Sequence, residues 1–346
     1  MSINNQKKLV LDTATNQSNL HNLPQYVLIT GPGRSGTTWL GQIMNTYQNC
    51  IYKYEPFLPI KQTSYSTWKE SLDSTDIEKL RDDFWSLCNS CNYQVDLPPF
   101  PLKTFRKQNK EVLRFLYTMG KKVELAKHLY QSYGRPSITK DTAVLIKDVN
   151  FPNQTLPRLC EVLEPHLIGL IRNPFANIAS YFKGLELNLF AKEHNQEIAK
   201  LKQSLDTPQG QHLTQYRDRL ETMSVSQFEA VRWRFQVEPL AEYIRTHEKS
   251  LLVVYEDLCN DPQGKVAEIF DFVGWKFDSG VRDFINLSTA QKTKAAKSSK
   301  AYYSVYRDPK KSMSKWKTQL TKEQKVDIAS IIYDSPLKDL WNDLPL

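Results

Sequence analysis

The chain has 346 residues, of which 40% are apolar, and it carries a formal net charge of +8. This is enough apolar sequence to fill the core of one large domain, and no run approaches the 18 or more apolar residues of a membrane-spanning helix. The five cysteines, an odd number, argue against a disulfide framework and favour a reducing compartment. These observations exclude an integral membrane protein and a small disulfide-stapled domain, and we expect a cytoplasmic globular enzyme.

Residues 1–24 are polar and lack the apolar stretch of a signal peptide, so we expect a flexible arm followed by one domain over 25–346. The domain is predicted to begin with the apolar strand Tyr26–Thr30, a glycine-rich loop over 31–36 and a helix. The loop has the Gly-x-x-x-x-Gly spacing of a P-loop, but Thr37 stands where a nucleotide triphosphatase needs lysine.

The loop is nevertheless suited to binding phosphate. Its glycines let the backbone approach an anion closely, and the helix that follows presents free N–H groups with partial positive charge. Arg34 adds a cation within the loop, and Thr37 and Thr38 add hydroxyl donors. The candidate phosphate-binding residues are Gly33, Arg34, Ser35, Gly36, Thr37, Thr38 and Trp39.

The second predicted strand, Cys50–Tyr54, ends at Glu55 and Pro56. Because the residue before a proline is pushed out of the helical region, we expect an extended backbone at Glu55. In a parallel sheet this strand end lies on the same edge as the phosphate loop, which is where ligands bind.

Helical patterns then fill about 58–141, which we interpret as an insertion, before a third strand, Ala143–Lys147, followed by Asp148. A fourth strand, His166–Ile171, leads to Arg172-Asn173-Pro174 and a helix that carries Ser180.

A second helical insertion is expected at about 185–245, and a fifth strand is expected over 251–255, ending at Tyr255. A turn should follow, and Asp261-Pro262 should start a helix that runs to Phe272. The fold class is therefore α/β, a P-loop-like three-layer domain with a central parallel sheet of about five strands flanked by helices and interrupted by helical insertions.

These motifs resemble those of sulfotransferases that use 3′-phosphoadenosine 5′-phosphosulfate (PAPS) as donor. Arg34-Ser35-Gly36-Thr37-Thr38-Trp39 is similar to the loop that binds the 5′-phosphosulfate, and arginine at its first position is typical of the carbohydrate and tyrosyl-protein members. The resemblance implies that Arg172 and Ser180, eight residues apart, hold the 3′-phosphate and that Tyr255 lies beside the adenine. It also implies a 3′-phosphate contact from Arg307. Because the C-terminal segment around it, about 288–320, includes a lysine-rich stretch, we expect this segment to act as a lid that orders when PAPS binds.

The family's reaction needs a base that takes a proton from the acceptor hydroxyl during in-line attack on sulfur. Cytosolic members use a histidine after the third strand, and here Lys147 is present but Asp148 follows it instead. Carbohydrate sulfotransferases carry a similar Tyr-Glu-Pro, which makes Glu55 the leading candidate for the base and Asp148 the second. Arg34 and Lys147 would stabilise charge at the sulfuryl group without a metal.

Several functional alternatives remain open at this stage. The acceptor is expected to be a saccharide or glycan hydroxyl, with a lipid, a small metabolite or a tyrosyl group as alternatives. A non-catalytic or kinase-like nucleotide-binding protein is the competing class, although Thr37 and the Arg172/Ser180 pair argue against a kinase. The lysine-rich stretch over 292–300 has no accompanying nucleic-acid motif, so we expect no nucleic-acid partner; the oligomeric state is undetermined.

Overall fold

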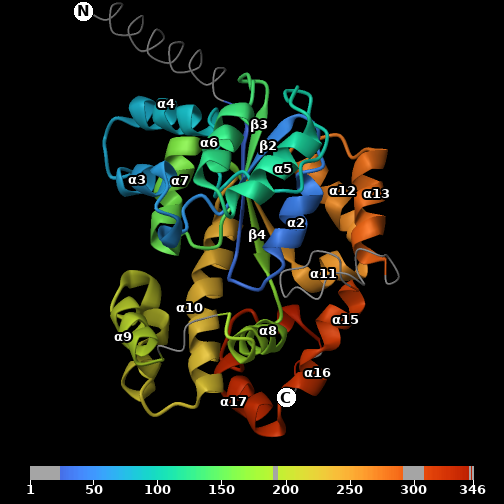
Figure 1. The fold of residues 1–346 in the computed structure, drawn as a ribbon. Helices are drawn as coiled ribbons and strands as arrows, with labels where there is room; N and C mark the ends of the chain where they lie inside the picture. The colour runs from blue at the N-terminus through green and yellow to red at the C-terminus, as the bar shows by residue number, and fades with distance from the viewer. Residues whose placement is uncertain (1–23, 190–193, 291–307, 343, 345–346) are drawn as a thin grey trace, which may run out of the picture.

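A computed structural model describes residues 24–189, 194–290, 308–342 and 344. Its centre is a parallel sheet of five strands in the order β2-β3-β1-β4-β5 (Figure 1). The strands are β1 (Tyr26–Thr30), β2 (Cys50–Tyr54), β3 (Ala143–Lys147), β4 (His166–Ile171) and β5 (Ser250–Val254). The predicted five-stranded parallel α/β fold is thereby confirmed.

The strands β1, β3 and β4 are buried on both faces, which explains why they are nearly continuous apolar runs rather than alternating ones. In β1, Tyr26 and Leu28 belong to the core on one face of the sheet, and Val27 and Ile29 belong to the core on the other. Side chains alternate between the two sides of a strand, so successive positions favour apolar residues, whereas the buried Lys53 of β2 is paired with Asp96.

Helices cover each face of the sheet, as Figure 1 shows. One face packs against α2 (Thr37–Met44), α11 (Tyr255–Asn260), α12 (Pro262–Phe272) and α13 (Ser279–Thr289). The other packs against α3 (Ser64–Glu70), α4 (Ile77–Cys88), α7 (Leu156–Leu163) and the end of α10 (Val225–Thr246). The three layers of the predicted fold are present.

A third apolar cluster lies beyond the carboxyl end of β4, where α8 follows that strand (Figure 1). It joins α8 (Pro174–Glu186), α9 (His194–Leu205), α10, α16 (Trp316–Gln319) and α17 (Lys322–Ile332). The helix α10 lies within the segment interpreted as the second insertion, yet it also packs against β4 and β5 and so forms part of the sheet's cover. The short helix α15 (Pro309–Ser314) leads into this cluster.

The segment between β2 and β3 is helical, and its second half forms a helical hairpin of α5 (Lys110–Gly120) and α6 (Glu124–Tyr133). The 3₁₀ helices are η1 (Pro59–Lys61), η2 (Asn153–Thr155), η3 (Pro208–Arg219) and η4 (Lys338–Leu340). Within the described ranges, no helix combines the length and the hydropathy needed to cross a membrane.

The fifth strand ends one residue earlier than the sequence predicts. Its pairing with β4 stops at Ile171 and Val254, and Tyr255 is the first residue of α11. The predicted turn at 256–258 is wrong, because the chain enters a helix as soon as the ladder ends. The predicted helix from Pro262 to Phe272 is confirmed, with the Asp261 carboxylate accepting a hydrogen bond from the Gly264 N–H at its start.

Candidate active site

The glycine-rich loop joins β1 to α2 and takes a backbone that only glycine tolerates at its end. Gly36 precedes α2 with φ of 100°, in the left-handed region, and no side chain caps the helix. A Cβ at Gly36 would lie 2.4 Å from the Tyr255 ring. The first-turn N–H groups of α2 therefore have no side-chain cap, which is the arrangement of a phosphate-binding helix N-terminus.

Arg34, Arg172 and Ser180 meet on the α8 side of this loop. Arg34 Nε donates to Ser180 Oγ at 3.3 Å, and Arg172 Nη1 donates to the Arg34 carbonyl at 3.1 Å. Asn177 Nδ2, also on α8, donates to the Gly33 carbonyl at 2.9 Å. The structure thus joins the two motifs that the sequence proposed for opposite ends of the donor.

The position of the Arg34 side chain differs from the sequence-based expectation. Arg34 was expected beside Lys147, at the sulfuryl end, but its guanidinium lies against Ser180, the residue proposed for the 3′-phosphate. Arg34 itself has φ of 71°, in the left-handed region, and the loop beside it is tied to α8 by the hydrogen bond from Asn177 to the Gly33 carbonyl.

Arg172 is held from several directions. Its Nη2 donates to the Ser312 carbonyl of α15 at 2.7 Å, and its guanidinium lies 4.7 Å from the centroid of the Tyr255 ring. Tyr255 is buried between Gly36 and Arg172, so its ring packs against the end of the phosphate loop. Arg307, proposed as a further phosphate ligand, lies outside the described residues, as do residues 291–307 of the proposed lid and residues 1–23 of the N-terminal arm.

Two donors in this cluster have no partner among the described residues. Ser35 Oγ and Arg172 Nε are both buried and unpaired, and Ser35 is fully inaccessible. Buried polar groups in folded proteins nearly always have a partner, and the acceptor atoms of a bound anion are one way of supplying it. A phosphate at the start of α2 has the chemistry to provide them.

Thr37 and Trp39 stabilise α2. Thr37 is buried, and Trp39 Nε1 donates to Ser288 Oγ of α13 at 3.0 Å. Trp39 therefore ties the phosphate-loop helix to α13, whereas Thr38 remains partly exposed on the first turn.

A second group of residues forms where β2 and β3 end side by side. Glu55 Oε1 accepts a hydrogen bond from Lys147 Nζ, and the Glu55 N–H donates to the Lys147 carbonyl at 2.7 Å. The Lys147 side chain is 2% exposed and that of Glu55 is 15% exposed. The pair is thus a mostly buried carboxylate and ammonium, with the carboxylate on the open side.

The expected extended backbone at Glu55 is wrong, because Glu55 has φ of 46°. Lys61 Nζ donates to the carbonyls of Tyr54 and Glu55, at 2.7 and 3.0 Å, and stabilises this turn. The Lys61 and Lys147 ammonium groups each lie 5.0 Å from the centroid of the Tyr54 ring. Burial lowers the pKa of Lys61 to about 8.

Sequence reasoning missed Lys61, which lies in the first helical insertion and belongs to no motif. A lysine six residues after Glu55 has no spacing that distinguishes it from a solvated surface lysine. Only the 3₁₀ turn η1, which folds the chain back over the end of β2, brings its ammonium to the Glu55 carbonyl.

Asp148 is engaged in fixing the same turn. Its Oδ2 accepts from the Phe57 N–H at 2.8 Å, and its Oδ1 accepts from the Asn150 N–H at 2.7 Å. The side chain is fully buried, and burial raises the pKa of the carboxyl. Of the two candidate bases, Glu55 has the more exposed carboxylate.

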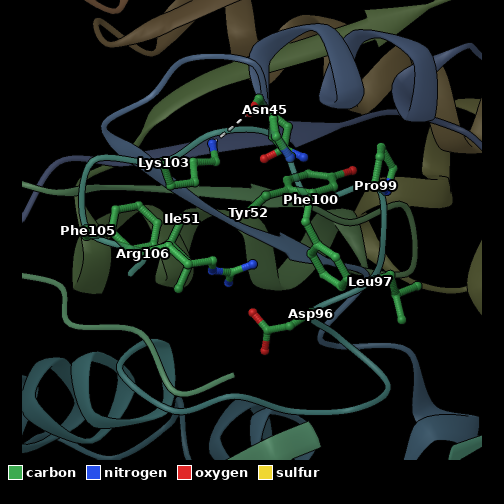
Figure 2. A pocket seen from close by; sticks show the side chains of 11 residues that line it. Asn45, Ile51, Tyr52, Asp96, Leu97, Pro99, Phe100, Lys103, Phe105 and Arg106 are labelled. Atoms are coloured by element: carbon green, nitrogen blue, oxygen red, sulfur yellow. Dashed lines mark hydrogen bonds between the residues drawn. The ribbon is translucent and has the colours of Figure 1, made fainter. Parts of the chain in front are cut away.

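Figure 2 shows a cavity away from these residues, between the start of β2 and the loop over 96–106. Its walls include Asn45, Tyr52 and Lys103, and the Lys103 ammonium points to the Asn45 carbonyl. Its volume of about 20 Å³ holds about one water molecule, too little for a substrate. Separately, no group of three or more metal-ligating side chains gathers within the ranges that the structure describes.

Comparison with known proteins identifies the family. A family model described as a sulfotransferase domain matches residues 24–340. Carbohydrate sulfotransferase 1 of Mus musculus is 22% identical over 320 residues, which cover 86% of this chain and 74% of the mouse protein. Its counterpart in Danio rerio is 24% identical over 326 residues, covering 86% and 73%.

Among solved structures, the sulfotransferase domain of the Synechococcus PCC 7002 olefin synthase matches with a TM-score of 0.44 and 16% identity, covering 91% of this chain and 98% of that one. A mouse sulfotransferase complexed with PAP (adenosine 3′,5′-bisphosphate) matches with a TM-score of 0.43 and 12% identity, covering 92% of this chain and 89% of that one. The match of the sulfotransferase domain to nearly the whole chain, from residue 24 to residue 340, shows that the protein belongs to the sulfotransferase family.

Proposed function

We propose that this sulfotransferase moves the sulfuryl group of PAPS to a hydroxyl of a saccharide or glycan and releases adenosine 3′,5′-bisphosphate. The observation that carries the proposal is the cluster of Arg34, Arg172 and Ser180 around the phosphate loop. Arg172 comes from the end of β4 and Ser180 from α8, so hydrogen-bond donors from outside the loop lie beside it. A donor molecule that carries a second phosphate, separate from the 5′-phosphosulfate, would use them.

The phosphates of PAPS would be bound by side chains and backbone N–H groups that the fold already positions around the loop. Ser35 Oγ and the first-turn N–H groups of α2 would donate to the 5′-phosphosulfate. Arg172 and Ser180 would hold the 3′-phosphate, with Arg34 Nε beside Ser180. Since these donors are positioned by the fold before any ligand arrives, little reorganisation is required on binding.

The acceptor half would be built on Glu55 and Lys147. In the proposed step the acceptor oxygen forms a bond to sulfur while the bond from sulfur to the bridging phosphate oxygen breaks. The Glu55 carboxylate takes the hydroxyl proton as this happens. Lys147, hydrogen-bonded to Glu55, would orient that carboxylate and offset negative charge that develops on the transferred group.

The proposed saccharide acceptor rests on two pieces of support. The matched relatives from mouse and zebrafish are named carbohydrate sulfotransferases. The Tyr54-Glu55-Pro56 sequence resembles that of carbohydrate sulfotransferases. Sulfate transfer from PAPS to oligosaccharides, measured beside a glycolipid, a phenol and a tyrosyl peptide, tests this part; transfer only to a non-saccharide would refute it.

Thermal unfolding with nucleotides tests the donor. A ligand at 100 times its Kd adds about 2.7 kcal/mol to stability, so adenosine 3′,5′-bisphosphate should raise Tm by several degrees. ATP with magnesium should raise it less. Ser35→Ala and Ser180→Ala should each reduce the shift from the bisphosphate, whereas Ser132→Ala, an exposed serine on α6, should leave it unchanged. A larger shift with ATP, or equal shifts in all the variants, would contradict the proposal.

A further inference from the structure

The α5–α6 hairpin exposes unusual amounts of apolar surface. It lies on the outside of the molecule (Figure 1), and the two helices bury only Leu113, Gly120, Ala126 and Tyr130. Yet α5 and α6 contain several further large apolar residues. Those that are exposed, with their exposed fractions, are Val112 (41%), Phe115 (63%), Met119 (38%), Leu125 (66%), Leu129 (50%) and Tyr133 (39%).

These side chains form one stripe on each helix. The α5 residues are spaced three and four apart and the α6 residues four apart, so each set lies along a single face of its helix. The Tyr133 hydroxyl accepts a hydrogen bond from the Asn109 N–H at the start of α5, so the α6 stripe reaches α5 at this end of the hairpin. We call the two stripes together the apolar face of the hairpin.

The hairpin is also strongly basic. Residues 107–135 contain seven lysines and arginines against two glutamates. Both glutamates already have partners, Glu111 with Arg114 at 3.7 Å and Glu124 with Lys127 at 2.5 Å. The cations that do not pair with these glutamates lie at both ends of the hairpin. Lys121 and Lys122 are at the turn between the helices, and Lys107, Lys110 and Arg135 are at the opposite end, where the chain enters α5 and leaves α6.

Helices that lie in the surface of an anionic bilayer combine an exposed apolar face with lysines and arginines on the rest of their surface. Apolar side chains enter the headgroup region while the cations contact anionic lipid heads. A second copy of the chain is the poorer occupant, because two basic hairpins would repel each other. We propose that the apolar face of the α5–α6 hairpin docks on the surface of a membrane containing anionic lipids.

Vesicle co-sedimentation with the full chain tests this inference. The probes are vesicles of phosphatidylcholine alone and vesicles with about a third phosphatidylserine. We expect binding to the anionic vesicles, weakened by salt, and little binding to the neutral ones. The triple variant Phe115→Ser, Leu125→Ser, Leu129→Ser keeps every charge and should lose at least tenfold in affinity for the anionic vesicles.

A matched variant controls for general loss of apolar surface. Leu287→Ser on α13, Val326→Ser on α17 and Tyr333→Ser just after α17 replace residues that are 45%, 68% and 56% exposed. Binding should persist in this triple variant. Thermal unfolding checks that both triple variants remain folded. Absence of binding to either vesicle, or equal loss in the two variants, would overturn the inference. So would a dimer in sedimentation equilibrium that the hairpin variant abolishes, because the face would then bind a second copy.

Discussion

Glu55 has a positive φ, and its partly exposed carboxylate accepts a hydrogen bond from the buried Lys147 ammonium. A non-glycine residue with positive φ is uncommon, and a following proline restricts it further. Such conformations persist only where surrounding contacts enforce them. Here the Lys61 ammonium, the Lys147 carbonyl and the Asp148 carboxylate each hold the turn by a hydrogen bond. Because three separate hydrogen bonds hold this uncommon conformation, it supports the hypothesis that the Glu55 carboxylate has a functional role.

Replacing this carboxylate gives the residue-scale prediction. Glu55→Gln keeps the shape of the side chain but cannot accept the proton, so turnover with PAPS should fall about 10²–10⁴-fold. Binding of adenosine 3′,5′-bisphosphate, measured by calorimetry, should change by less than about threefold, because the donor cluster lies elsewhere.

The control for this variant is Glu242→Gln, which changes an exposed glutamate on α10 and should leave turnover intact. Full activity in Glu55→Gln would remove Glu55 as the base. A large loss of bisphosphate affinity with little change in turnover at saturation would instead place Glu55 in donor binding.

At the scale of the element, β1, the phosphate loop and α2 form a unit whose glycines differ in how far they can be replaced. Gly36 sits at φ of 100° with the Tyr255 ring directly behind it, whereas a Cβ on Gly33 would meet nothing within 4 Å. The same loop therefore contains a glycine that cannot be replaced and a glycine that can.

The two positions make a matched pair of variants. Gly36→Ala must both strain the backbone and displace Tyr255, so it should lower the free energy of unfolding by more than about 2 kcal/mol. Gly33→Ala should leave stability within about 1 kcal/mol or raise it slightly, since alanine restricts the unfolded chain. Urea unfolding measures both, and similar losses in the two variants would show that the loop tolerates more rearrangement than the contacts indicate.

At the scale of the whole molecule, buried carboxyl groups should shape the dependence of stability on pH. Burial is the main cause of a raised pKa at Asp148, Glu229 and Glu256, and it raises the pKa of Glu229 to about 7. Glu229, on α10, pairs with Arg232, which also approaches Glu197 of α9 and lies over the Tyr181 ring of α8. The charge state of Glu229 thus affects the contact between three helices.

The sign follows from comparing the folded and unfolded states. A carboxyl with a raised pKa binds its proton more tightly when folded, so its stabilising contribution is complete below the unfolded pKa of about 4.5 and is lost as the pH rises through about 7. Between pH 5 and pH 8 the wild-type protein should lose about 1–3 kcal/mol of unfolding free energy relative to Glu229→Gln.

Urea unfolding at several pH values checks this prediction. Glu242→Gln serves as the control, because an exposed carboxylate on the same helix should follow the wild-type pH profile. Parallel profiles for the wild type and Glu229→Gln would show that Glu229 keeps an ordinary pKa in the folded protein.

The sequence by itself determined the strands and the motifs at their ends. Buried parallel strands must be apolar on both faces and are bounded by glycine, proline or charged residues, so β1 to β4 could be located from local pattern alone. The phosphate loop and the start of α2 were predictable for the same reason, since left-handed glycines and a helix N-terminus leave a local signature.

Only the tertiary structure decided how those strand ends meet. The contact between Arg34 and Ser180 joins residues 146 positions apart, and that between Glu55 and Lys147 joins residues 92 apart. The left-handed backbone at Glu55 has no local signal, because hydrogen bonds to distant Lys147 and Asp148 hold that turn. Lys61, six residues after Glu55, belongs to no motif, and its role appears only once η1 folds back over the end of β2. Local propensity specifies an element, but the direction of a side chain at a loop depends on which distant partner the fold brings to it.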